Sequence, residues 1–502
     1  MTAADSYAEL VRRSKELGVL GSCAAVLGWD QQTYMPANGA GLRGEQMAFL
    51  AGLSHGKATD PKVGELLAAV EGSDLVRDPE SDAAANVREL RRGYDRATKL
   101  PAALVEELAR VTTAAQQAWQ QARAANDFPT FRPLLEQVVA LKRQEAQAVG
   151  YADHPYNALL DEYEPGATVA EVREVFAGLT RDLVPLIKAI GESGKKPDRS
   201  VLERDFPVER QKVFAEAAAV AFGFDFASGR LDTTAHPFCS GVGPGDCRLT
   251  TRYNPRFFSE AFFGVLHETG HGLYEQNLPA EHFGTPVGGA CSLGIHESQS
   301  RLWENQVGRG RPFWDHFFPR LRQTFPALAG VEPDRFYFAI NEVKPSLIRV
   351  EADEATYNLH VALRFELELG LISGDLAVAD LPGAWNERFK AFLGLDVPDD
   401  ARGCLQDIHW SFGGIGYFPT YTLGNLYAAQ LMAAARRDLG GLDDDFRRGE
   451  FGRLKLWLGE KIHRHGGRYR AGELCRRATG EPLSATPFVS YLNEKFGPLY
   501  GV

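Results

Sequence analysis

The sequence lacks the features of membrane, secreted and nucleic-acid-binding proteins. It has no apolar run close to the roughly 20 residues that cross a bilayer, and its N-terminus, MTAADSYAELVRRSKELG, has no apolar signal-peptide core. It also has no basic excess, because its net charge of −11 is the reverse of a nucleic-acid-binding footprint. We therefore expect a cytoplasmic protein with no membrane and no nucleic-acid partner.

Cysteine is scarce and regular repeats are absent. The cysteines form no CxxC pair, so the pattern is neither a disulfide framework nor a zinc ribbon, and we expect isolated reduced thiols. No repeat of 30–45 residues is found, which argues against a solenoid. The six cysteines are Cys23, Cys239, Cys247, Cys291, Cys404 and Cys475.

What is present is the composition of a globular protein, with 44% apolar and 24% charged residues. Apolar residues recur with helical spacing, as at Leu104, Leu108 and Val111. An exception is 246–253, where alternation and β-branched residues predict a short strand or hairpin. No long polar linker divides the chain, so we predict one mainly helical domain over 1–502, arranged as two lobes around a cleft. Helices are predicted over 3–18, 43–56, 82–98, 101–124, 130–148, 168–191 and 204–222.

The motif HETGH at 267–271 predicts a metal site. We expect Asn254-Pro255 to open a helix that runs to Asn277, with His267 and His271 one turn apart on one face. Two imidazoles so placed can bind one Zn²⁺, and Glu268, roughly 100° around the helix, suits the general base of a metallopeptidase. The helical glycines predict a close approach by another backbone or by substrate. They are Gly264, Gly270 and Gly272.

A catalytic zinc site needs a third protein ligand and an open position for water. Position 277 is Asn277, which excludes the metzincin pattern, and Glu275 lies about 12 Å in rise from His267, too far to close a tetrahedron. The next predicted helix, 294–308, offers further donors, and the residues alone do not choose between them. These donors are His296, Glu297 and Glu304.

Ordered motifs along the chain resemble the carboxypeptidase Taq family of metallocarboxypeptidases. The resemblance implies Glu297 as the third ligand and a homodimer. It also implies a large helical fold with a deep substrate groove, like neurolysin and ACE, and a small β-element near the active site. The motifs are the HETGH helix, His236-Pro237-Phe238, Asp246-x-Arg248-x-Thr250, His296-Glu297-Ser298-Gln299, Ile348-Arg349-x-x-Ala352-Asp353 and Gly403-x-x-Gln406-Asp407-x-His409-Trp410, with Trp29-Asp30-Gln31-Gln32 near the N-terminus.

The segment 409–421 places one histidine and two tyrosines around a glycine-rich turn. Its spacing is similar to that of the oxyanion-binding residues of related helical oligopeptidases. The resemblance therefore implies that Tyr421 binds the oxyanion and that His409 lies beside it, with Tyr417 as a further substrate-binding candidate. The alternative is that these aromatic residues only satisfy a buried turn.

A carboxypeptidase must also bind a free C-terminal carboxylate, which suits an arginine fork. Arg349 is the candidate that the family motif supports. The alternative is that Arg349 is simply paired with an acid of its own predicted helix, 344–370. Arg248 and His236 are interpreted as structural supports, with Arg248 paired to Asp246.

These residues predict a Zn²⁺ enzyme, with Co²⁺ as a second metal, that releases C-terminal amino acids from peptides. Water activated by the metal attacks the peptide bond, and Glu268 takes the proton. Three alternatives stay open on the motif alone. They are an oligopeptidase or dipeptidyl carboxypeptidase with the same zinc site, a non-catalytic metal-binding protein, and a zinc hydrolase of non-peptide amides.

Overall fold

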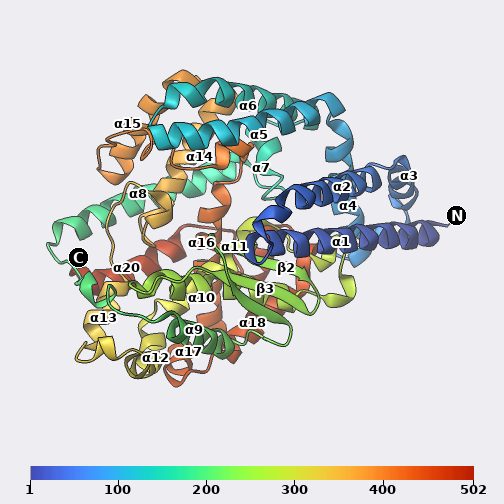
Figure 1. The fold of residues 1–502 in the computed structure, drawn as a ribbon. Coiled ribbons are helices and arrows are strands. Elements are labelled where there is room, and N and C mark those ends of the chain that lie inside the picture. Colours follow the sequence, from blue (N-terminus) through green and yellow to red (C-terminus); the bar gives the residue numbers. More distant parts are fainter. Residues whose placement is uncertain (1) are drawn as a thin grey trace. The chain divides into compact units, whose positions relative to one another are not determined.

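The computed structural model describes residues 2–502, which form 20 α-helices and one three-stranded sheet (Figure 1). The prediction of a mainly α-helical fold is confirmed. Among residues 2–502, no helix combines the length and the apolar character needed to cross a membrane. The helices are α1 Ala3–Thr33, α2 Ala40–Ala58, α3 Pro61–Val70, α4 Asp82–Lys99, α5 Ala102–Ala125, α6 Phe128–Val149, α7 Tyr156–Leu160, α8 Val169–Glu192, α9 Val208–Phe222, α10 Phe258–Asn277, α11 Leu293–Arg301, α12 Arg311–Thr324, α13 Pro333–Ile340, α14 Tyr357–Ser373, α15 Leu381–Leu393, α16 Pro419–Leu439, α17 Leu442–Arg448, α18 Gly452–Lys461, α19 Ala471–Thr479 and α20 Thr486–Tyr500.

Local sequence signals set many of these helix ends. Thr168 and Glu171 form a capping box at the start of α8, where each side chain accepts a backbone N–H of the other residue. Asn126 ends α5 in the left-handed conformation, which asparagine tolerates. The helix predicted from 204 begins only at Val208, because Pro207 restricts the backbone of the residue before it.

The chain divides into two compact units, each built from three stretches. Unit 1 comprises Met1–Ala97, Pro197–Ile340 and Ala428–Pro482. Unit 2 comprises Thr98–Lys196, Asn341–Tyr427 and Leu483–Val502. The expectation of a cleft between two lobes stays a prediction.

The sheet belongs to unit 1 and confirms the predicted β-element. Its strands are β1 Gly229–Thr233, β2 Cys239–Gly243 and β3 Asp246–Thr251, in the order β1-β3-β2. β1 runs parallel to β3 and β2 antiparallel to it, with an irregularity between Gly241 and Gly243. β2 and β3 lie against α10, so the sheet supports the helix that carries the HETGH motif (Figure 1).

All six cysteines are free, as expected, but the expectation that they are isolated is wrong for one pair. Cys239 on β2 and Cys247 on β3 lie with their Sγ atoms 3.6 Å apart. The two strands pair antiparallel, and this pairing brings together thiols that are eight residues apart in the sequence.

An aromatic core anchors the first half of α10. Phe258 and Phe262, one turn apart, stack with ring centroids 4.9 Å apart, and both are buried. Phe214 of α9 packs against Phe262 at 5.3 Å, and Trp314 of α12 packs against it at 5.5 Å. Burying each such ring stabilises the fold by roughly 1.5–3 kcal/mol. This packing fixes the position of the first turns of α10, which precede the HETGH motif.

Two further predicted helix starts are wrong. α10 begins at Phe258, not at Asn254, because the Asn254 side chain accepts the Arg256 N–H in a local turn. Arg349 does not lie on a long helix but in a short 3₁₀ turn, Arg349–Glu351, and α14 starts later. Asp353 makes this break, since its carboxylate accepts the backbone N–H groups of Ala355 and Thr356.

Candidate metal centre

Two helices of unit 1, α10 and α11, come into backbone contact at a glycine. A Cβ on Gly270 would lie 2.5 Å from the Gln299 carbonyl oxygen and 2.5 Å from Ser300 Cα, so only glycine fits there. The predicted close approach of another backbone is therefore confirmed at Gly270, whereas Gly272 lies against side chains, those of Phe224 and Leu249. It is wrong for Gly264, whose Cβ would meet only Thr251 Oγ1 at 3.5 Å.

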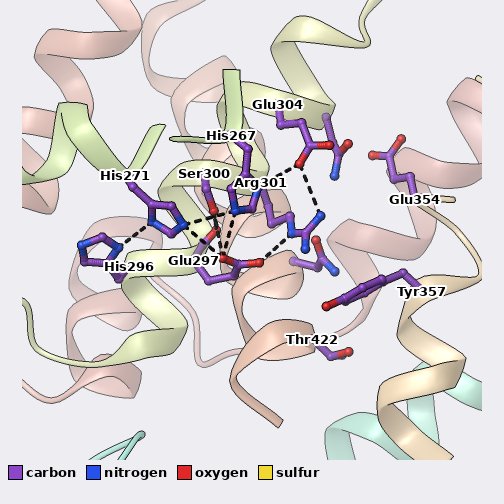
Figure 2. A network of polar contacts seen from close by, with 12 residues as sticks. His267, His271, His296, Glu297, Ser300, Arg301, Glu304, Glu354, Tyr357 and Thr422 are labelled. Carbon is purple, nitrogen blue, oxygen red and sulfur yellow. Dashed lines mark hydrogen bonds and ion pairs between the residues drawn. The ribbon is translucent and has the colours of Figure 1, made fainter. Parts of the chain in front are cut away.

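This contact brings together the three predicted metal ligands, His267, His271 and Glu297 (Figure 2). The Nε2 atoms of the two histidines lie 3.2 Å apart. Glu297 Oε2 lies 3.6 Å from His267 Nε2 and 3.4 Å from His271 Nε2. Tetrahedral bonds of about 2.0–2.1 Å place two ligand atoms about 3.3–3.4 Å apart. The donor set and its spacing therefore fit a tetrahedral Zn²⁺ ion.

Each donor atom is aimed by a second contact on the other side of its group (Figure 2). His267 Nδ1 lies 3.0 Å from Glu304 Oε2, and His271 Nδ1 lies 2.6 Å from His296 Nδ1. Arg301 Nε donates to Glu297 Oε1 at 2.7 Å, which leaves Oε2 facing the histidines. Such outer contacts fix ring orientation and tautomer at metal sites.

A π-helical segment, Leu302–Gly308, follows α11 and carries Glu304. π-Helical turns are rare and occur frequently at functional sites. Arg301 also contacts Glu304 at 3.3 Å, and Arg309 approaches Glu304 Oε1 at 3.4 Å while covering the ring of Phe263 at 3.7 Å. The carboxylate beside His267 is thus held between two guanidinium groups.

The pKa values of the group follow from burial and from its many charges. Burial disfavours the charged form of Glu304, but the hydrogen bond to His267 and the charge of Arg301 lower its pKa to about 2. Burial also opposes ionisation of Glu297, and Arg301 with the two histidines holds its pKa well below the usual value. Burial lowers the pKa of His271 to about 4. Two ionised carboxylates and a neutral His271 are the states that metal binding needs.

Glu268 differs from the other acids of the group. It is buried, and burial raises its pKa to about 7, with the neighbouring Glu297 and Glu304 adding to the shift against His267. Within residues 2–502, no side chain or backbone group hydrogen-bonds to the Glu268 carboxylate. A carboxylate with a pKa near neutrality and no competing partner is suited to proton transfer.

The other predicted site residues form a separate group in unit 2. His409 Nε2 lies 3.2 Å from the Tyr421 hydroxyl, and the Tyr417 ring lies 5.3 Å from that of Tyr421. His409 Nδ1 is buried without a hydrogen-bond partner, and burial lowers the His409 pKa to about 3, so the ring is neutral. The structure thus brings these three aromatic residues together.

Glu368 of α14 fixes the glycine-rich turn that presents His409. Its carboxylate accepts the Trp410 indole N–H at 2.8 Å, the Gly416 N–H at 3.1 Å and the Tyr156 hydroxyl at 2.6 Å. Gly416 has φ +98, and a Cβ there would lie 2.9 Å from the Leu159 backbone. The Glu368 carboxylate therefore holds both ends of the turn 410–416 that follows His409.

Arg349 is paired, but not with an acid of its own segment. Its Nε and Nη2 donate to Asp407 Oδ1 at 3.0 and 2.8 Å, and Nη1 donates to the Tyr357 hydroxyl at 2.8 Å. Arg364 binds the other oxygen of Asp407 at 2.7 Å. Burial opposes ionisation of Asp407, but the two arginines hold its pKa well below its ordinary value. Arg248 pairs with Asp246 at 2.7 Å, as expected.

Comparison with known proteins decides the family. A family model described as carboxypeptidase Taq (M32) metallopeptidase matches residues 9–496. The chain is 50% identical to thermostable carboxypeptidase 1 of Thermus thermophilus over 100% of both proteins, and 39% identical to carboxypeptidase 1 of Bacillus subtilis over 97% of both. The chain belongs to the carboxypeptidase Taq (M32) family. It is a metallocarboxypeptidase, an enzyme that hydrolyses peptide bonds.

Solved structures agree with this assignment. The crystal structure of an M32 carboxypeptidase from Deinococcus radiodurans R1 is 46% identical and superposes with a TM-score of 0.95. The alignment covers 99% of this chain and 100% of that one. The resemblance predicted from the motifs is therefore confirmed.

Several polar residues of this M32 carboxypeptidase were not assigned a role from the sequence. Arg301 could have been found, because it lies four residues after Glu297, where helical side chains meet. Asp407 stands in a family motif, but its partner Arg349 is 58 residues away, and no local pattern links them. Glu368 is one of two acids in α14, and its burial distinguishes it from the exposed Glu366.

Proposed function

We propose that this M32 carboxypeptidase uses Zn²⁺ held by His267, His271 and Glu297 to release one C-terminal residue at a time. The observation that carries the proposal is the spacing of 3.2–3.6 Å among their three donor atoms, with Glu268 next to the first ligand. When bound, the metal ion acts as a Lewis acid toward the peptide carbonyl and toward water. Co²⁺ suits the same donors and is the second candidate.

Glu268 is proposed as the general base. Its carboxylate accepts a proton from the attacking water and passes it to the leaving amine. A pKa near 7 in the metal-free protein supports both halves of this transfer. The contacts of Glu304, His296 and Arg301 keep the three ligands in place during this proton transfer.

Tyr421 and His409 are proposed to stabilise the oxyanion of the substrate. A hydroxyl and a ring nitrogen that already share one hydrogen bond can present a donor to the same oxygen. Tyr417, packed on both rings, is proposed to contact the substrate beside them.

Arg349 is proposed to bind the C-terminal carboxylate of the peptide. Arg349 and Arg364 share one carboxylate, Asp407, so the cluster keeps one positive charge that Asp407 does not neutralise. This excess of positive charge lies next to Tyr421, since the Arg349 guanidinium is 5.1 Å from the Tyr421 ring. A cation beside the proposed oxyanion donors suits a substrate that ends in a carboxylate.

The substitution Glu268→Gln tests the general base. The variant should retain stoichiometric zinc and lose turnover by about 10²–10⁴-fold, because only the proton acceptor is removed. Zinc content is measured by atomic spectroscopy, and release of the terminal residue is measured on N-blocked dipeptides. Normal turnover in this variant would contradict the assignment of Glu268 as the general base.

A second assay separates the proposed reaction from its nearest rival. An oligopeptidase or dipeptidyl carboxypeptidase would cleave internally quenched peptides away from the terminal residue. We expect this enzyme to cleave substrates with a free C-terminal carboxylate and to spare those with an amidated C-terminus.

The homodimer and the cytoplasmic location stay predictions. An exposed apolar face on α2 supports the dimer, since this helix buries none of its residues and leaves Phe49 72% and Leu42 63% exposed. Such a face is typical of an interaction surface. Sedimentation of the wild type and of Phe49→Glu at micromolar concentration measures whether the mass of 55.2 kDa per chain doubles through this helix.

A further inference from the structure

His296 contacts the predicted ligand His271 (Figure 2) and, on its other side, the Glu275 carboxylate, and it is not itself part of the ligand set. Its Nδ1 lies 2.6 Å from His271 Nδ1, and its Nε2 lies 2.8 Å from Glu275 Oε1. Glu275, His296 and the ligand His271 are therefore linked in series by two polar contacts. The other ligand histidine, His267, contacts its carboxylate directly, at 3.0 Å.

When both histidines are neutral, these contacts allow a single arrangement of protons. An ionised carboxylate only accepts, so the proton between Glu275 and His296 belongs to His296 Nε2. The Nδ1 atom of a neutral His296 is then an acceptor, which requires the proton of His271 to be on Nδ1. His271 Nε2 is left with a free lone pair, and this is the atom that faces Glu297 and His267.

We propose that Glu275 and His296 are positioning residues, which act as a relay that orients His271 and holds it in the metal-binding tautomer. This inference rests on the proposed function, since it concerns the same metal. It assigns no ligand role to either residue. Outer contacts of this kind typically change metal affinity by about 10–100-fold.

The sheet contributes to the relay through a glycine. Gly241 of β2 lies directly against the Glu275 carboxylate, and a Cβ at this position would overlap Glu275 Oε2 and lie 2.5 Å from Glu275 Cδ. The neighbouring bulge of β2 bends the strand next to this contact. Gly241 therefore leaves the space in which Glu275 reaches His296.

The experiment measures the dissociation constant of Zn²⁺ by competition with a chelator, together with residual carboxypeptidase activity. His296→Ala should weaken zinc binding by about 10–100-fold. His296→Asn keeps an acceptor near the Nδ1 position and should recover part of this loss. Gly241→Ala should weaken binding in the same direction, because it displaces the Glu275 carboxylate without removing a polar group.

Matched controls separate the relay from general damage. Gly264→Ala adds the same methyl group to a helical glycine of α10, where it meets only Thr251 Oγ1 at 3.5 Å. Glu281→Gln removes an exposed carboxylate from the same unit. Both controls should bind zinc as the wild type does, and all variants should melt within a few degrees of it in the metal-free state.

A double-substitution cycle distinguishes a relay from two independent supports. Glu275→Gln should weaken zinc binding in the wild type and have almost no further effect in His296→Ala, because its influence passes through His296. Glu304→Gln should remain additive with His296→Ala, since it acts on the other ligand. Additive effects of Glu275→Gln and His296→Ala would overturn the relay.

The outcomes also separate this inference from the proposed function. If the wild type bound no Zn²⁺ and Glu297→Gln changed nothing, the ligand set itself would be wrong. If the wild type bound Zn²⁺ tightly and His296→Ala bound it equally well, only the relay would be overturned.

Discussion

The two polar groups of the enzyme differ in the sign of the charge that they bury. The metal group of unit 1 gathers four carboxylates and two guanidinium groups, so it holds an excess of negative charge. The group of unit 2 gathers two guanidinium groups, Arg349 and Arg364, on the single carboxylate of Asp407. Because buried charge must be compensated, the first group suits a metal cation and the second suits an anion. This difference in charge supports the separate roles proposed for the two groups, a metal site in unit 1 and a binding site for a carboxylate in unit 2.

The largest effect is expected from removing one charge of the metal group. Glu297→Gln keeps the shape of the side chain but removes a ligand, so zinc binding and turnover should both fall by more than the 10–100-fold of an outer contact. Zinc titration and the release of the terminal amino acid measure the two losses. Glu304→Gln is the matched comparison and should show only about 10–100-fold weaker binding.

Equal losses in Glu297→Gln and Glu304→Gln would contradict the ligand assignment, because ligand and outer contact would then be indistinguishable. Near-ultraviolet circular dichroism of both variants controls for a change of fold. Neither substitution should alter the thermal unfolding of unit 2 if the units unfold separately.

A smaller effect is expected when unit 2 loses its proposed oxyanion donor. Tyr421→Phe should reduce kcat by about 10²–10³-fold, because it removes one donor to the developing negative charge. Zinc content should not change, since Tyr421 is not one of the three predicted ligands. Tyr417→Phe is the control and should change kcat little. A loss of zinc in Tyr421→Phe would contradict the proposal that Tyr421 binds the oxyanion and has no part in metal binding.

Much of the fold was predictable because it follows from local patterns. Apolar spacing located α5, α6 and α8 to within two residues, and the alternating residues at 246–253 located β3. Two of the failures occurred where a side chain hydrogen-bonds to the backbone at the start of a predicted helix or inside it. Asn254 accepts the Arg256 N–H in a local turn, and Asp353 accepts the Thr356 N–H, which a helix continuing from 344 would have used.

The candidate site was predictable where residues lie close together in the sequence. The spacing of His267 and His271 is a property of one helix, whereas the choice of Glu297 came from a family motif. The contacts from His271 to His296 and from Arg349 to Asp407 join residues 25 and 58 positions apart. Such pairs depend on how helices pack, and in the first case on a glycine, Gly270, that permits the approach.

The substitution Arg349→Lys tests whether the uncompensated positive charge in unit 2 binds the carboxylate of the substrate. Lysine keeps the charge but loses the fork, so we expect KM for free carboxylate substrates to rise about 10–100-fold with a smaller change in kcat. Amidated peptides, which are poor substrates, should show no such change. If the variant only unfolded at a lower temperature and kept its KM, Arg349 would be a structural partner of Asp407.

The smallest effect on activity is expected at Glu368, which fixes the turn of His409 and carries no proposed chemistry. Burial raises its pKa to about 7, against hydrogen bonds from Tyr156, Gly416 and Trp410. The folded protein therefore retains a proton on Glu368 that the unfolded chain loses above its ordinary pKa of 4.5. This group's contribution to the free energy of unfolding is complete below pH about 4.5 and is lost as the pH rises toward 7.

Glu368→Gln should flatten that part of the pH dependence, because glutamine does not titrate. Unfolding by urea at pH values from 5 to 8 measures the slope in the wild type and in the variant. The control is Glu366→Gln, which removes an exposed carboxylate from α14, the helix that also carries Glu368. An unchanged slope in Glu368→Gln would mean that the three hydrogen bonds keep the Glu368 carboxylate ionised. The turn after His409 would then be held by a buried negative charge, which Arg364 stabilises.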